Sequence, residues 1–119
     1  MKPLEFLKLA QTLAEKGDEA SLRTAISRAY YALFHNALGV LRSFGENVPS
    51  DSRAHSEIPK RLRKISLKER NELLRELADQ LDSLRKIRRD ADYRLRAPIP
   101  SKDCVQYYIN RAKEIKKMI

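Results

Sequence analysis

The segment AYYALFHNALGVL, residues 29–41, is the longest apolar stretch of the chain, and it decides which folds are possible. It belongs to a longer helical pattern that is apolar over most of its circumference. Leu22, Ile26, Ala29, Leu33 and Val40 lie on one side, and Tyr30, Phe34, Ala37 and Leu41 lie beside them. A helix with so wide an apolar surface belongs in the centre of a bundle, or between a bundle and a second subunit. His35 and Asn36 interrupt the stretch, which is too short to span a bilayer.

Start and stop signals bound this central helix and the one before it. Asp18 is a suitable N-cap, and the pattern continues to about Phe44, where Gly45 ends it. An earlier helix is predicted from about Pro3 to Lys16, with proline in its first turn and Gly17 as its stop.

Three further helices are predicted after the polar loop that follows Gly45. The third covers roughly Ala54–Lys64. SLKE, Ser66–Glu69, matches a capping box and is predicted to open a fourth helix that reaches about Asp92. APIPS, residues 97–101, breaks the chain, and Ser101 caps a fifth helix that runs from Lys102 to the end.

The last two helices carry apolar stripes that can pack against the central one. The fourth has Leu74, Leu77, Leu81, Leu84 and then Arg88 at alternating spacings of three and four, and the fifth has Val105, Tyr108, Ile109, Ala112, Ile115 and Ile119. No linker or repeat divides the 119 residues. We therefore predict an all-α, up-and-down bundle of four to five helices, forming a single domain over residues 1–119.

The charge balance favours a polyanionic partner. The chain has 25 Lys and Arg against 16 Asp and Glu, for a net charge of +9. Such a surface attracts nucleic acid, a nucleotide or an acidic protein, although basic domains without a specific polyanion are also common. The single Cys104 excludes an internal disulfide, and with no signal peptide in view it points to the cytoplasm.

Two sets of polar residues interrupt the apolar stripes and are candidates for a site. Arg28, Tyr31 and His35 share one stripe of the central helix, where burial is costly unless each polar group is paired. Arg28 could meet an acidic residue and His35 a backbone carbonyl, or both could line a cleft in which arginine holds phosphate.

The second set ends the fourth helix. Arg85, Arg88 and Asp92 line one face, and basic residues there complement the negative end of the helix dipole. Asp92 is unfavourable at that end unless it is neutralised, which predicts a salt bridge with Arg88 or with Arg28 across the bundle. Spacing alone favours this purely structural interpretation.

Other chemistry is not indicated. The three glycines form no phosphate-binding loop, and His35, His55 and Cys104 are too scattered for a zinc site. No cofactor or metal is predicted.

Three stretches in this order, SRAYYALFHNAL (27–38), HSEIPKRL (55–62) and LRKIRRDADY (84–93), resemble the HEPN domain in its small stand-alone prokaryotic form. A final helix of the type SKDCVQYYINRAKEI (101–115) follows, and the resemblance covers about residues 5 to 118. It implies a bundle of four to five helices and homodimerisation through the second and fourth. It also implies a minimal nucleotidyltransferase as a common partner, often in a toxin–antitoxin pair.

Several branches of that family are metal-independent ribonucleases with a motif of arginine, four to six residues, then histidine. By resemblance Arg88 matches the arginine, but five residues on stands Tyr93. A tyrosine with an ordinary pKa of about 10 is a poor general base at neutral pH. His35, His55 or His35 of the partner subunit would have to supply the imidazole.

The leading hypothesis is therefore a homodimer that binds a nucleotide or RNA phosphate in a basic cleft. Arg28 and Arg88 would hold the anion and Asp92 would orient an arginine, while Tyr31, His35 and Tyr93 would supply hydrogen bonds or stacking. One alternative is a ribonuclease toxin with a relocated histidine, in which Arg88 and His35 are the catalytic candidates. Another is an interaction module that partners a minimal nucleotidyltransferase, with Tyr93 as a modification acceptor.

Overall fold

The computed structural model describes residues 2–94, 96, 98 and 101–118, with side chains as far as residue 115. Within these residues it contains five helices and no strand. They are α1 (Pro3–Lys16), α2 (Glu19–Ser43), α3 (Ala54–Glu69), α4 (Glu72–Tyr93) and α5 (Lys102–Met118). The prediction of an all-α fold is confirmed.

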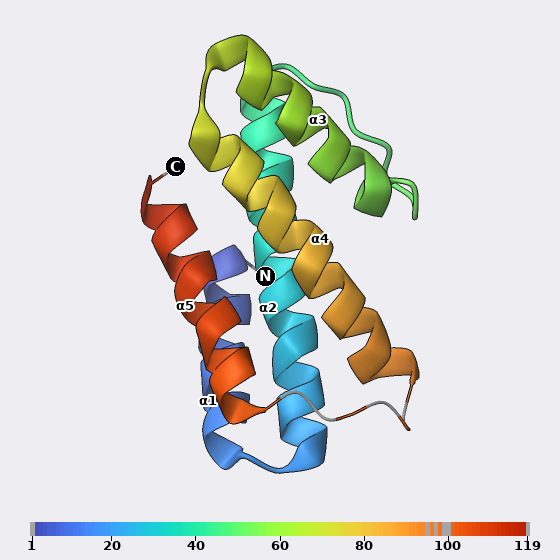
Figure 1. Ribbon diagram of the computed structural model, residues 1–119, viewed down its shortest axis with the longest axis vertical. Coiled ribbons are helices and arrows are strands. Elements are labelled where there is room, and N and C mark those ends of the chain that lie inside the picture. Colours follow the sequence, from blue (N-terminus) through green and yellow to red (C-terminus); the bar gives the residue numbers. More distant parts are fainter. Residues whose placement is uncertain (1, 95, 97, 99–100, 119) are drawn as a thin grey trace.

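The central helix is α2, as its wide apolar surface predicts. It packs against each of the other four helices, while α1 also contacts α5, and α3 also contacts α4 (Figure 1). In this view α1 and α4 run down the bundle and α2, α3 and α5 run up it, because the α2–α3 loop returns along the bundle before α3 begins. Helix α4 crosses in front of α2. One hydrophobic cluster, drawn from all five helices, fills the space between them.

The predicted stripes are the ones that become buried. On α4 the buried leucines are Leu74, Leu77, Leu81 and Leu84, and on α5 the buried residues are Val105, Ile109, Ala112 and Ile115. Ile119, predicted to extend the α5 stripe, lies outside the described residues. Arg88 continues the α4 stripe at the level where the core gives way to polar side chains.

The helix ends also follow the sequence signals, with one exception. Gly17 has a φ of 75° after α1, a left-handed conformation that glycine adopts without steric cost. The carboxylate of Asp18 accepts the Ser21 amide at 3.1 Å, and Ser101 Oγ accepts the Cys104 amide at 3.0 Å. Most of the predicted break at residues 97–100 falls outside the described residues.

The exception is the capping box at Ser66–Glu69, and that prediction is wrong. These residues continue α3, which ends at Glu69 rather than Lys64. Ser66 Oγ donates to the carbonyl of Asn71 at 2.8 Å, so its hydroxyl closes the turn instead of opening a helix. Arg70 adopts a left-handed φ of 51°, and Asn71 caps α4 by accepting the Leu73 amide at 3.1 Å. A serine followed by a glutamate three residues later therefore did not mark a helix start here.

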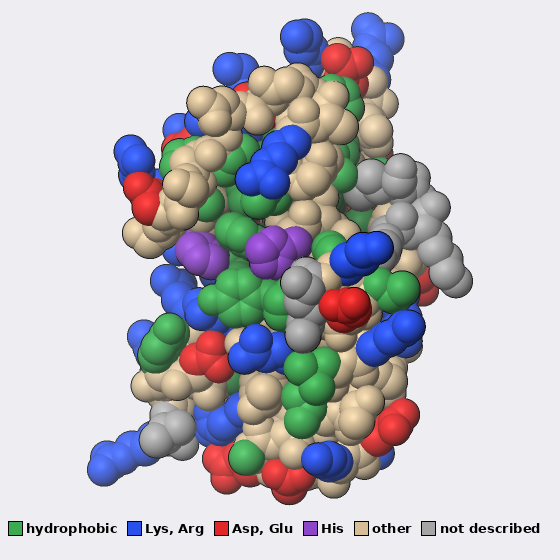
Figure 2. Space-filling view, turned by 180° about the vertical axis from the view of Figure 1, so that it is seen from behind, with side chains coloured by type: hydrophobic (Ala, Val, Ile, Leu, Met, Phe, Trp, Pro, Cys, Tyr) green, Lys and Arg blue, Asp and Glu red, His purple; other side chains and the backbone are tan. Residues whose placement is uncertain are grey.

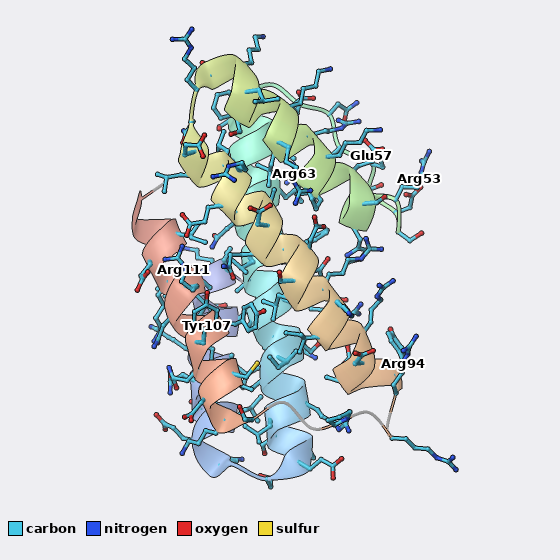
Figure 3. All side chains as sticks on the ribbon, viewed as in Figure 1. Arg53, Glu57, Arg63, Arg94, Tyr107 and Arg111 are labelled. Carbon is cyan, nitrogen blue, oxygen red and sulfur yellow. The ribbon has the colours of Figure 1, made fainter. Side chains whose placement is uncertain are left out.

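Ion pairs attach the outer helices to α4. Arg63 of α3 pairs with Asp79 at 2.9 Å and with Asp82 at 2.7 Å. Arg111 of α5 pairs with Glu76 (Figure 3). None of the helices in the described part of the chain combines the length and the hydropathy that a bilayer crossing requires.

Candidate phosphate-binding site

Helices α2 and α4 place Arg88 inside a group of tyrosines. Its Nη2 donates to the hydroxyl of Tyr31 at 2.9 Å. The guanidinium carbon lies 5.3 Å from the ring centroid of Tyr31, 5.7 Å from that of Tyr30 and 5.5 Å from that of Tyr93. Only 12% of the Arg88 side chain is exposed. Cation–π attraction and burial together hold this guanidinium in one place.

Asp92 neutralises Arg88, in agreement with the salt bridge predicted for it. Arg88 Nε lies 3.0 Å from Asp92 Oδ2, close enough for an ion pair, although its N–H does not meet the angle of a hydrogen bond. Ser27 Oγ also donates to Asp92 Oδ2, at 3.3 Å. From the Ser27–Asp92 contact to the Tyr31–Arg88 contact, the position moves four residues forward on α2 and four residues back on α4. The two helices therefore run antiparallel through the site.

A residue that the sequence did not single out holds the end of α4. Arg23, only 7% exposed, extends from α2 and its Nη1 donates to the carbonyls of Asp90, Ala91 and Arg94 at 3.2 to 3.4 Å. Its Nε pairs with Glu19 at 3.1 Å. The last carbonyls of a helix have no partner within the helix, so a guanidinium there both satisfies them and complements the dipole. The signal was present in the sequence, because Arg23 lies between apolar positions of the central helix.

The two histidines lie close to this group on a single face (Figure 2). His55, at the start of α3, has its Nδ1 2.6 Å from the hydroxyl of Tyr30 and its ring 4.9 Å from that of Phe34. Tyr30 is 1% exposed, and this burial raises its pKa to about 12 despite the opposing charges of Arg85 and Arg88. The hydroxyl therefore keeps its proton, and it donates to Nδ1 or accepts from Nδ1–H according to the imidazole tautomer. Sequence reasoning considered His55 only as a substitute histidine and did not identify Tyr30.

His35 lies one helical turn beyond Tyr31, at the surface. Its ring stacks on Phe6 of α1, with centroids 5.6 Å apart and an interplanar angle of 16°. Within the described residues it has no backbone carbonyl as a hydrogen-bond partner, so the structural role suggested for it is wrong. Desolvation by these aromatic neighbours lowers the pKa of His35, and the charge of Arg42 lowers it further.

A pocket of about 430 Å³ opens between α2 and the loop that leads to α3. Its lining residues include Tyr31, Phe34, His35, Arg42 and His55. In Figure 2 the histidine side chains lie beside hydrophobic ones, with Lys and Arg side chains nearby on the same face. The pocket is thus continuous, through Tyr31, with the tyrosines around Arg88.

Several arginines around this site have no carboxylate partner among the described side chains. Arg28 and Arg85 are partly exposed, and Arg42 and Arg89 are exposed. One of the two roles considered for Arg28, a pairing with an acidic residue, is therefore not found among the described side chains. Tyr93 is 72% exposed at the end of α4, with its ring near Arg88. The structure thus gathers Arg28, Tyr31, His35, Arg88, Asp92 and Tyr93 around one α2–α4 surface, and adds Tyr30, His55 and Arg85.

The histidines make stability depend on pH in a defined direction. Burial is the main cause of the lowered pKa of both His35 and His55, and Arg85 and Arg88 contribute at His55. An unfolded imidazole with a pKa near 6.5 then binds protons more readily than the folded one, so acidification favours unfolding. We expect urea unfolding at a series of pH values to show stability falling from pH 7 through the folded-state pKa values. The double variant H35Q/H55Q should flatten that slope, and an unchanged slope would contradict the assignment.

No group of His, Cys, Asp or Glu side chains in the described part of the chain is arranged to hold a metal ion.

The family comparison matches nearly the whole chain. The model of the HEPN domain matches residues 2–119. Neither the curated proteins nor the solved structures contain a match to this chain.

Proposed function

The chain belongs to the HEPN domain family, and on that basis we propose that it binds RNA, or a nucleotide, through phosphate contacts in a basic cleft of a homodimer. One observation carries this proposal: Arg28 and Arg85, which are partly exposed and have no carboxylate partner among the described side chains, lie beside Arg88 and its tyrosines. Arg28 precedes Tyr31 by three residues on α2, and Arg85 precedes Arg88 by three on α4. Because these helices are antiparallel, the two arginines lie on either side of the Tyr31–Arg88 hydrogen bond.

The arginines of the site divide into two roles. Arg88 already has Asp92, Tyr31 and three aromatic rings around it, so it fixes the geometry and adds positive potential. Arg28 and Arg85 retain free donors and can form bidentate contacts with phosphate. The rings of Tyr31 and Tyr93 can stack against a base, and their hydroxyls can form hydrogen bonds with a ribose or base.

A homodimer that uses α2 and α4 would complete the cleft. Both helices carry the arginines named above, and apposing two such surfaces would line one groove from both subunits with positive charge. A phosphate backbone in that groove would offset the repulsion that the paired surfaces otherwise experience.

Binding without cleavage fits this site better than catalysis. Tyr93 occupies the position of the family histidine, and both histidines have lowered pKa values, mainly because of burial. The Tyr30 hydroxyl occupies Nδ1 of His55, so only Nε2 of this imidazole remains to meet a ligand. The ribonuclease alternative retains one supporting observation, which is that His55 lies close enough to Arg85 and Arg88 to feel their charge.

The cellular setting that suits this proposal is the cytoplasm, in a toxin–antitoxin or nucleotidyltransferase-associated system. A minimal nucleotidyltransferase is the partner implied by the family resemblance. Co-expression with such an enzyme encoded nearby tests this part independently of RNA.

The decisive experiment follows binding and cleavage of labelled mixed-sequence RNA by the pure protein in EDTA, across a salt series. We expect salt-sensitive binding and no cleavage. R28A and R85A should each weaken binding about tenfold and reduce the log–log salt slope by about 1. R75A is the matched control, because Arg75 lies on α4 with Glu72 as its partner, away from the site.

Three other outcomes would each contradict a part of this proposal. Cleavage that H55A abolishes would establish the ribonuclease alternative. Binding that is insensitive to both arginine variants would refute this site assignment. If RNA is neither bound nor cleaved, a protein partner becomes the better explanation of the basic surface.

A further inference from the structure

We propose that the pocket between α2 and the α2–α3 loop receives one unpaired base of single-stranded RNA. This inference rests on the proposed function and specifies its substrate class. It concerns the pocket of about 430 Å³, a volume within the range of roughly 300–1,000 Å³ typical of small-molecule sites.

The inner walls of the pocket are planar rings. Phe34 lies 4.9 Å from the His55 ring, and it meets His35 edge-on at 5.4 Å. Tyr31 joins them and connects the pocket to Arg88 through its hydroxyl. Bases displayed by single-stranded RNA stack on such aromatic and imidazole surfaces, whereas the bases of a duplex are already stacked on each other.

The polar groups at the pocket suit a base carrying a phosphate. Ser50 and Ser52 contribute hydroxyls, and Nε2 of His55, whose Nδ1 is taken by the Tyr30 hydroxyl, can donate or accept according to the tautomer. Arg42 also lines the pocket, has no carboxylate partner among the described side chains and can meet the attached phosphate.

The one carboxylate in the lining does not oppose an anion strongly. Both oxygens of Asp51 accept from the guanidinium of Arg53, at 2.8 to 3.0 Å, and the same pairing lowers the pKa of Asp51. The charge of this carboxylate is thereby compensated within the loop. The pocket therefore combines aromatic walls, hydrogen-bonding groups and a net positive rim.

The test compares ligands that share a phosphate but differ in the base. Calorimetric titration with AMP and with ribose 5-phosphate measures how much the base contributes to the affinity. A comparison of single-stranded and duplex RNA of the same sequence measures whether the base must be unpaired. We expect AMP to bind at least tenfold more tightly than ribose 5-phosphate. We expect single-stranded RNA to bind more tightly than duplex by a similar factor.

Two variants that fill the pocket test its location. Val48 lines the pocket and Ser50 is an exposed lining residue, so V48W and S50W should bring AMP affinity down to that of ribose 5-phosphate. L67W is the control, because Leu67 is 82% exposed on α3 and does not line the pocket. Thermal unfolding of each variant checks that the fold is retained, and S50W covers the case in which V48W does not fold.

The outcomes separate this inference from the proposed function. Equal affinity for AMP and ribose 5-phosphate, with both weakened in R28A and R85A, would leave phosphate binding intact and overturn the base pocket. Tighter binding of duplex than of single strands would overturn it as well. If no phosphate compound and no RNA binds, both proposals are wrong.

Discussion

Replacing Arg23 with methionine is expected to lower the free energy of unfolding by about 3 kcal/mol, because one buried and two part-buried carbonyls lose a charged donor. Arg23 is 7% exposed and donates to the carbonyls of Asp90, Ala91 and Arg94. Methionine fills similar space without a donor, so the buried Ala91 carbonyl loses this donor, while the Asp90 carbonyl keeps the Arg94 amide. The last turn of α4 should fray, which displaces Asp92 and Tyr93 together.

Chemical denaturation of R23M and R23K measures this effect. Lysine keeps the charge but cannot span several carbonyls with one planar group, so R23K should lose less stability than R23M. R75M is the matched control, since Arg75 is 58% exposed and its substitution should change stability by less than about 0.5 kcal/mol. Amide hydrogen exchange should show lost protection at residues 90–94 in R23M alone. Equal losses in R23M and R75M would contradict the capping role.

Replacing Arg88 with methionine is expected to cost about 2 kcal/mol of stability and to weaken RNA binding more than tenfold. The stability term comes from the Tyr31 hydrogen bond, the contacts with three tyrosine rings and the pairing with Asp92. The binding term follows from the proposed function. Without Arg88, an uncompensated Asp92 would stand beside the proposed phosphate contacts.

A double-mutant cycle with D92N separates these contributions. D92N alone should cost less than R88M, because an asparagine can still accept from Ser27 and leaves Arg88 its tyrosine contacts. The pair should show a coupling energy of about 1 kcal/mol in urea unfolding. For RNA binding, D92N should be neutral or favourable, since it removes a negative charge from the cleft. A loss of affinity in D92N equal to that in R88M would show that the site acts only through folding.

Much of the architecture followed from local patterns. The spacing of apolar residues correctly predicted that α2 is central and that the α4 and α5 stripes are buried. A helix that buries one face has apolar residues every three or four positions, so the buried face can be read from the sequence. Gly17, Asp18 and Ser101 marked helix ends through their own backbone and side-chain chemistry. The α3–α4 turn was missed because two overlapping signals compete there. The hydroxyl of Ser66 can open a helix or close one, and only the position of Asn71 decides between them.

The candidate site also has one part that the sequence determined and another that only the tertiary structure fixed. The sequence by itself determined that Arg28, Tyr31 and His35 share a face, that Arg88 and Asp92 share another, and that Asp92 needs a cationic partner, since all of these depend on spacing within one helix. Which helices meet, and at what register, is a property of packing. Only the tertiary structure brought Tyr31 to Arg88, Tyr30 to His55 and Arg23 to the end of α4. These contacts join residues 25 to 71 positions apart, and no local pattern encodes a distance of that kind.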